Sequence, residues 1–447
     1  MGIGTFVNKS ARPITTTTRR ARTSTGDLVL IAGVFALCLF GLLMLYSASA
    51  DFSLWNYGSQ TFMFNKQLIF MASGILIAFI VSRLDYHIWL RFALPVMGLT
   101  IAFLILILFI KDVRNGAIRT IIGGSIQPSE LAKLATILYL SVWLYSKQEY
   151  LHNIELGLIP LGVILGGIAG LIYLEPDLSA TITVFLLGGL LFFLAGGELR
   201  QIVLFVVVAL VAGYIVIQFS STGRGRMASY LAGLKDPLKS SDHILWSLES
   251  VFKGGWFGVG IGNASTKLIG LPFSATDSIF AVIVEELGLV GALGLISLYG
   301  VLLWRGLVIA KHAPDLLGSV IAAGLTFWIC IEAFINMSMI IGLVPVAGNA
   351  LPFVSAGGSN LISTLTAIGI LLSISRQSGS SVRAAGTPSI SSRRTGGRNL
   401  PRTAGTGDGK IPAEANEGRL FSATVDLRRR NRRRSVSRPG RPENHSG

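Results

Sequence analysis

The sequence predicts an all-α polytopic membrane protein with about ten transmembrane helices. Three observations lead to this fold class. Hydrophobic residues make up 51% of the 447 residues, and the mean hydropathy is +0.64. Charged residues make up only 14%, whereas a soluble domain carries about a quarter. The apolar residues also gather in stretches close to the roughly 20 residues that an α-helix needs to cross a bilayer.

Ten such stretches follow one another, seven before a long polar segment and three after it. We expect each stretch to form a transmembrane helix. Spans five and six are separated only by the short break Glu175-Pro176-Asp177. The expected spans are 28–50, 66–82, 92–110, 130–146, 155–174, 176–195, 199–219, 279–303, 316–341 and 357–375.

The long polar segment, residues 220–278, is predicted to be a large extracytoplasmic loop between spans seven and eight. Its side follows from the Lys and Arg residues of the shorter loops, which gather on the cytoplasmic face of membrane proteins. Both termini and the loops at 83–91 and 305–311 fall on one face of a ten-span protein, which we therefore expect to be cytoplasmic. Three basic residues in an outward loop run against this orientation: Lys111, Arg114 and Arg119.

The net charge of +15 is carried by the two ends of the chain. Residues 1–27 have a net charge of +4 and residues 376–447 a net charge of +11, so the part between them is neutral. We expect residues 1–27 and 377–447 to be basic, disordered cytoplasmic tails around a membrane domain at 28–376. The Arg-rich C-terminal tail is either a plain positive-inside tail or a docking segment for anionic lipid or an acidic partner. Nucleic-acid binding is not expected, because no aromatic residues alternate with the basic ones.

Several catalytic motifs are absent from the sequence. No HExxH, P-loop or GxSxG stretch occurs, so metalloprotease, ATP-driven transport and serine-hydrolase functions have no support. Cys38 and Cys330 lie in predicted spans and are expected to be packing residues. We expect the first apolar stretch to stay in the membrane as an anchor, because it is too long for a cleaved signal.

Asp277 is the strongest candidate for chemistry. It lies where the polar segment re-enters the membrane, directly before the apolar run from Ile279. A carboxylate at that boundary costs desolvation energy unless a polar cavity or a cation receives it. We therefore take Asp277 as the centre of the functional site.

Two other polar stretches have both a structural and a functional interpretation. Ser129 is placed to cap span four, and Glu130 suits its first turn. Glu130 and Lys133 are three residues apart, so they share a helix face and are expected to pair. Glu175 and Asp177 either line an outer cavity or bind a cation, or they form a hydrated turn in which Asp177 caps the next helix.

Four polar residues fall inside predicted spans: Glu285, Glu286, Glu332 and Asn336. Charged groups at this depth rarely face lipid. We expect them to be internal pairing groups rather than catalysts. The glycines Gly357 and Gly358 precede the last span, where exposed backbone N–H groups suit an anion at a helix N-terminus, although tight helix packing also uses glycine.

Six stretches together resemble the SEDS family, the FtsW, RodA and SpoVE proteins of bacterial division, elongation and sporulation. They match in order and spacing across about residues 28–376, and the two tails fall outside the resemblance. The stretches are LFGLLMLYSAS (39–49), QPSELAK (127–133), EPDLSAT (175–181), GGWFGVGIG (254–262), TDSIFAVIVEELG (276–288) and GLVPVAGNALPFVSAGGS (342–359).

The resemblance implies a peptidoglycan glycosyltransferase that polymerises lipid II at the outer face of the cytoplasmic membrane, in cell division or cell-shape maintenance. Asp277 matches the position of the family's essential aspartate. Its implied role is general base: it takes the proton from the acceptor sugar's 4-hydroxyl as that oxygen attacks the donor's anomeric carbon. The reaction inverts the anomeric centre and releases undecaprenyl pyrophosphate. The implied partner is a class B penicillin-binding protein, which is a transpeptidase.

The implied leaving group also needs cations or oriented N–H donors. The only cofactor that we consider is a divalent cation, Mg or Mn, and no residues are assigned as its ligands. By the same resemblance, Glu130 and Lys133 correspond to the family's intramembrane ion pair, and grooves between helices would admit the polyprenyl tails. The candidates for substrate binding are Arg224, Arg226, Lys253, Lys267, Thr276, Ser355, Gly357 and Gly358.

The chain departs from the family pattern at three places. The family commonly has an acidic residue and a histidine just before the Thr-Asp pair, where this chain has Phe273 and Ala275, and a Gln in span nine, where it has Glu332. Because of the first two departures, the alternative function of a non-catalytic scaffold that activates a penicillin-binding protein remains under consideration. The buried acids would also permit a lipid II flippase, although no convincing internal repeat of the kind that transporters use is found. The ASTKLIGLP run (264–272) and the basic tail lean toward the FtsW or SpoVE branch.

Overall fold

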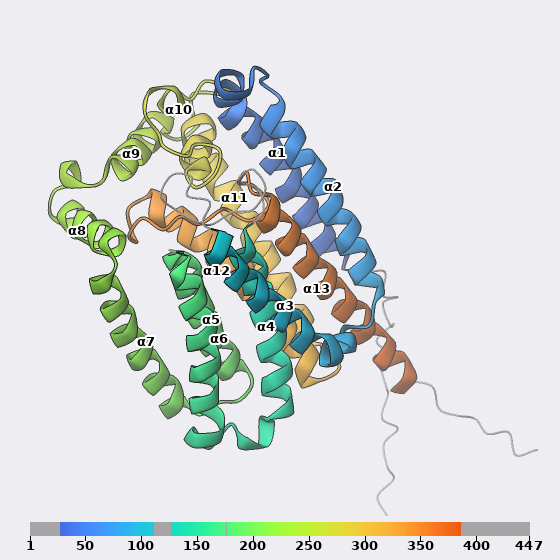
Figure 1. Cartoon of the computed structure of the whole chain (residues 1–447). Coiled ribbons are helices and arrows are strands. Elements are labelled where there is room, and N and C mark those ends of the chain that lie inside the picture. Colours follow the sequence, from blue (N-terminus) through green and yellow to red (C-terminus); the bar gives the residue numbers. More distant parts are fainter. Residues whose placement is uncertain (1–26, 111–126, 176, 386–447) are drawn as a thin grey trace, which may run out of the picture. The chain divides into compact units, whose positions relative to one another are not determined.

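The protein is described from a computed structural model, which describes residues 27–110, 127–175 and 177–385 (Figure 1). Every regular element in these ranges is helical. Ten helices coincide with the ten predicted spans: α1 (Leu28–Tyr57), α2 (Phe62–Arg83), α3 (Trp89–Ile110), α4 (Pro128–Ser146), α5 (Ile159–Leu174), α6 (Leu178–Leu194), α7 (Leu199–Phe219), α11 (Ile279–Lys311), α12 (Leu316–Ile340) and α13 (Gly358–Ala385).

The predicted all-α polytopic fold class is confirmed. Within the described residues, eight helices are long and apolar enough to cross a membrane, counting with α3 and α5 the short helical turns that precede them. The other two predicted spans are marginal for physical reasons. α4 carries Glu130 and Lys133 in its first turns, and α6 has only 17 residues. That all ten helices cross the bilayer therefore stays a prediction.

The polar segment 220–278, predicted as a loop, is itself largely helical. It contains α8 (Ser221–Lys235), α9 (Asp242–Gly254) and the single turn α10 (Thr266–Ile269). Figure 1 shows α9 and α10 beside the beginning of α11, and α9 packs against both α11 and α12. α9 is amphipathic and buries Ile244, Ser247, Ser250 and Gly254 on one face. This face explains why the segment folds back onto the helices instead of extending into water.

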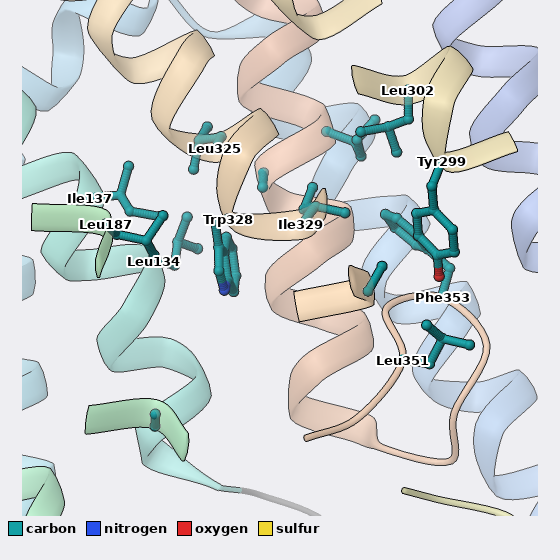
Figure 2. Close-up of a cluster of buried hydrophobic side chains, with 14 of the residues drawn as sticks. Leu134, Ile137, Leu187, Tyr299, Leu302, Leu325, Trp328, Ile329, Leu351 and Phe353 are labelled. Carbon is teal, nitrogen blue, oxygen red and sulfur yellow. The ribbon is translucent and has the colours of Figure 1, made fainter. Parts of the chain in front are cut away.

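The core is centred on α12, which packs against α4, α6, α11 and α13. Figure 2 shows the indole of Trp328 beside Ile137 and Leu187, with Tyr299 and Phe353 near the other face of the same helix. Glycines allow the closest approaches between helices: a Cβ at Gly369 would lie 2.6 Å from the carbonyl oxygen of Ala78, where α13 crosses α2.

Residues near the two termini and the loops at 83–91 and 305–311, which were predicted to share one face of the membrane domain, contact one another. Asp27 caps α1 and accepts hydrogen bonds from Arg305 on α11, with 3.1 Å between Asp27 Oδ1 and Arg305 Nε. Arg376 donates to the carbonyl oxygen of Arg83 at 3.0 Å. These groups therefore lie at the same end of the bundle, as predicted. The tails predicted at 1–27 and 377–447 fall outside the described residues, apart from Asp27 and the end of α13.

Candidate functional site

The glycine-rich stretch 254–262 pairs its backbone with a break in α11. Val259 N–H donates to Glu285 O and Leu289 N–H donates to Gly255 O, at 3.0 and 2.9 Å. Gly288 has a φ of +68° inside the helix, and a Cβ there would collide with the carbonyl oxygen of Trp256. Both the dihedral and the close approach require glycine. The stretch therefore works as a backbone clamp on α11 around the break at Gly288.

Glu285 and Glu286 fix the next part of the polar segment to the same helix. The carboxylate of Glu285 accepts hydrogen bonds from the backbone N–H and hydroxyl of Ser265 and from Thr266. Glu286 forms a buried ion pair with Lys267, 2.8 Å from Nζ to Oε1, and accepts from Ser47 on α1 at 2.6 Å. These contacts confirm the prediction that Glu285 and Glu286 are internal pairing groups.

Asp277 lies in the tight turn between α10 and α11 and is half-buried. The turn reverses at Phe273, whose φ is +53°, and both Thr276 N–H and Ser278 N–H donate to the carbonyl oxygen of Phe273. A positive φ at an aromatic residue is strained and persists only where surrounding contacts hold it. α11 begins at Ile279, two residues after Asp277, so Asp277 is not part of that helix.

The connection between α12 and α13 supplies those contacts. Ser355 donates its hydroxyl to Thr276 O at 2.6 Å, and Ala356 N–H donates to Ala275 O at 2.9 Å. Asn336 of α12 donates to Asp277 O at 2.9 Å. The structure thus brings three of the predicted site residues, Asp277, Thr276 and Ser355, into one place through their backbone and hydroxyl groups.

A histidine that the sequence analysis missed also holds this turn. His243, in the first turn of α9, lies with Nε2 2.7 Å from the hydroxyl oxygen of Ser278. The same hydroxyl is 2.6 Å from Pro272 O. Burial first, and then the charge of Arg226, lower the pKa of His243. The only signal in the sequence was a rare histidine within the long polar segment, and no spacing connected it with Asp277.

A buried ionic cluster joins α4, α12 and α13. Lys133 Nζ lies 2.9 Å from Glu130 Oε1, which confirms the predicted pair, and it also contacts the carboxylate of Glu332. Asn360 donates to both acids, at 2.9 Å to Glu130 and 3.3 Å to Glu332. Lys133 thus lies between two carboxylates and is hydrogen-bonded to both, which is the pairing that a buried charge requires.

The break between α5 and α6 lies next to the start of α4. Asp177 caps α6 through Ala180 N–H, as the structural interpretation expected, and its other oxygen accepts from Gln127 and from the hydroxyl of Ser129. The expected capping role of Ser129 is therefore wrong, because its hydroxyl is drawn to the charged acceptor. Glu175 is 1% exposed, and within the described chain neither carboxylate oxygen has a hydrogen-bond partner.

The basic candidates are not gathered at one point. Lys253 pairs with Glu249 at 2.7 Å, and Lys267 is taken up by its buried ion pair. Arg224 is exposed on α8, whereas Arg226 lines a cavity between α8 and α9.

Gly357 and Gly358, the two glycines among the substrate-binding candidates, lie beside α2. Gly357 N–H donates to Gln67 of α2 at 3.3 Å, and a Cβ at Gly358 would meet the ring of Phe70 at 2.7 Å. Tight packing against α2 is therefore a sufficient reason for Gly358, whereas a Cβ at Gly357 would meet only Asn360 at an ordinary 3.6 Å. In the described ranges, no group of three or more His, Cys, Asp or Glu residues is placed to hold a metal ion.

The profile of the family of FtsW, RodA and SpoVE, described as cell cycle protein, matches residues 28–380. The chain belongs to this family. Similar proteins include stage V sporulation protein E of Bacillus subtilis, 38% identical over 79% of this chain and 97% of the relative. The "Probable peptidoglycan glycosyltransferase FtsW" of Trichlorobacter lovleyi is 36% identical over 78% of this chain and 93% of that protein.

Solved structures of the FtsW/RodA/SpoVE family share the fold. One chain, from a structure described as "Structural coordination of polymerization and crosslinking by a peptidoglycan synthase complex", is 27% identical, with a TM-score of 0.65 over 79% of this chain and 98% of that one. The rod shape determining protein RodA of Thermus thermophilus is 25% identical, with a TM-score of 0.58 over 79% of this chain and 97% of RodA. Together with the apolar helices, this family membership identifies a multi-pass membrane protein.

Proposed function

We propose that the protein is a peptidoglycan glycosyltransferase that polymerises lipid II into glycan strands, in cell division or cell-shape maintenance. Relatives that match most of the chain carry the name peptidoglycan glycosyltransferase FtsW. The observation that supports the proposal most directly is the turn around Asp277. Its backbone is held by Asn336, Ser355 and the Ser278–His243 contact, each from a different segment. Such support suits a group whose position must be fixed for catalysis.

Asp277 is the general base of the proposed reaction. Its carboxylate accepts the proton of the acceptor sugar's 4-hydroxyl while that oxygen forms a bond to the anomeric carbon of the donor. The bond from the anomeric carbon to the diphosphate oxygen breaks at the same time, and undecaprenyl diphosphate leaves with the electron pair. Attack from the opposite face inverts the anomeric centre. A half-buried carboxylate fits this role because the acceptor sugar can reach it while part of it is shielded from water.

The proposed orientation puts segment 220–278 outside and both termini in the cytoplasm. Lipid II is available at the outer face, so Asp277 must open toward that side. The proposed partner is a class B penicillin-binding protein, which crosslinks the strands made here. A solved structure with this fold comes from a complex whose description names both polymerisation and crosslinking.

The test compares glycan synthesis, lipid transport and complementation. We expect the purified protein with its transpeptidase to convert labelled lipid II into polymer, and the Asp277→Asn variant to make none while inserting normally. The matched control is Asp51→Asn, an exposed aspartate at the end of α1. Translocation of lipid II in proteoliposomes without polymer would instead indicate a flippase. Complementation by Asp277→Asn would indicate a scaffold.

A further inference from the structure

A cavity of about 370 Å³ lies between α8, the 3₁₀ turn Pro237–Lys239, α9 and the start of the α12–α13 connection. Its volume is in the range of small-ligand sites, which begin at about 300 Å³. Asp277 is not among the residues that line it. The cavity is connected to the Asp277 turn by His243, which lines the cavity and contacts Ser278.

The cavity has a cationic and hydroxylic wall. Arg226 supplies a positive charge, and within the described chain none of the residues that line the cavity is Asp or Glu. Ser241 also lines it, and its buried hydroxyl oxygen has no hydrogen-bond partner within the described chain. Ser241 is the residue before α9, so the first N–H groups of that helix and its dipole add positive potential at the same place. These groups together favour an anion.

His243 adds a hydrogen-bond acceptor to this wall. The hydroxyl of Ser278 has one proton, and Pro272 O at 2.6 Å can only accept it. His243 Nε2 must then be the donor to Ser278, since the two atoms are 2.7 Å apart. A neutral imidazole that is protonated on Nε2 keeps Nδ1 as an acceptor. In the proposed site, Nδ1 is the acceptor for a ligand hydroxyl or amide.

The remaining lining is apolar and aromatic. Leu248, Ile341 and Val346 contribute aliphatic surface, and Tyr230 contributes a ring whose hydroxyl donates to Leu343 O at 2.9 Å. Sugar rings have apolar faces and polar edges. A wall of this mixed kind suits a sugar better than a bare inorganic ion, which would leave the apolar side unused.

We propose that this cavity binds an anionic amino sugar, with the anionic group at Arg226 and Ser241 and a hydroxyl or amide at His243. This assignment rests on the proposed function, since the substrates of a peptidoglycan polymerase carry amino sugars with two kinds of anion, the diphosphate and the peptide carboxylates. A ligand in the cavity would contact His243, and the hydrogen bond of His243 with Ser278 connects it to the Asp277 turn. The site therefore holds a part of the substrate without direct contact to Asp277, which does not line the cavity.

The test measures binding of three soluble probes to the purified full-length protein by calorimetry. N-acetylglucosamine 1-phosphate carries the phosphate, muramyl dipeptide carries a carboxylate without phosphate, and N-acetylglucosamine is the neutral control. We expect at least one anionic probe to bind at least tenfold more tightly than the neutral sugar. Preference for the phosphate assigns the diphosphate as the source, and preference for the dipeptide assigns the peptide.

Variants locate the binding in the cavity. Arg226→Gln should reduce the anionic preference to less than threefold, and Arg226→Lys should restore most of it. Lys235→Gln removes the same charge from the exposed end of α8, outside the lining, and should leave the preference intact. Ser241→Ala, a change too small to unfold the protein, should weaken the anionic probe about threefold, as loss of one hydrogen bond predicts.

Other results would overturn the assignment. Equal binding of all three probes, an unchanged preference in Arg226→Gln and Ser241→Ala, or an equal loss in Lys235→Gln would each do so. Asp277→Asn should bind the probes like the wild type, because Asp277 does not line the cavity. If the probes bind as expected but the wild type makes no polymer, the proposed function fails and the sugar site stands. If the wild type polymerises normally but binds no probe selectively, the sugar site fails and the proposed function stands.

Discussion

The side-chain nitrogen of Asn336 lies 2.9 Å from the backbone carbonyl oxygen of Asp277 and 2.6 Å from that of Asn349. One amide on α12 thus joins the turn before α11 to the connection before α13. Asn336 is fully buried, and its one side-chain amide donates to both carbonyl groups. The position of Asp277 relative to the rest of the site is set in part by a residue that touches no substrate.

Asn336→Ala should therefore lower polymerisation more than it lowers expression. It removes the donor that the two carbonyl groups share, at a cost of about 1–3 kcal/mol, and loosens the turn. We expect kcat to fall at least about tenfold, which corresponds to about 1.4 kcal/mol. The control is Asn56→Ala, which removes an exposed amide that donates to one carbonyl. Equal rates for the two variants would contradict the positioning role.

The ionic cluster predicts an order of stabilities. Lys133→Met leaves two buried carboxylates without their cation and should cost about 3–5 kcal/mol. Glu332→Gln keeps the Lys133–Glu130 pair and a polar partner for Asn360, so the melting temperature should change little. Thermal unfolding in detergent measures both. A less stable Glu332→Gln than Lys133→Met would show that the cluster is held together in another way.

Two glycines of α11 should respond oppositely to alanine. Gly288→Ala places a Cβ against the carbonyl oxygen of Trp256 at a positive φ, so the backbone clamp must open and both stability and polymerisation should fall. Gly294→Ala meets nothing within 4 Å and should be neutral or stabilising by up to about 1 kcal/mol. The test compares the melting temperatures of the two variants, and equal values would rule out the backbone clamp.

Glu175 predicts a pH dependence of stability. Burial first, and then the neighbouring carboxylate of Asp177, raise the pKa of Glu175 to about 8 from an ordinary value of 4.5. The folded protein then holds a proton that the unfolded chain loses above pH 4.5, so stability falls as the pH rises from about 4.5 to 8. Glu175→Gln should flatten this part of the melting-temperature profile and raise the value at about pH 8. A parallel profile for the two proteins would disprove the shift.

The sequence was sufficient where the determining residues lie close together in the chain. Glu130 and Lys133 pair because three residues bring side chains onto one helix face, and Asp177 caps α6 because its place before the helix determines that contact. The positions of the ten long helices likewise follow from local hydrophobicity.

Contacts between distant segments were not predictable in the same way. Ser129 had the pattern of a capping residue, but its hydroxyl is bound by Asp177, 48 residues away. The contact of His243 with Ser278 depends on the fold-back of α9, and the amphipathic face that drives it was hidden in a polar segment. The pair Lys267–Glu286 requires the break at Gly288 and the clamp, which no local pattern encodes.

The most direct measurement is the initial rate of lipid II polymerisation by Asp277→Asn at saturating lipid II, with the Asp51→Asn variant alongside. Loss of a general base costs about 10²–10⁴-fold in rate. We expect a fall of at least about 10²-fold with an unchanged melting temperature, and a wild-type rate for the control. A rate for Asp277→Asn within about threefold of the wild type would contradict the assignment of this carboxylate as the base.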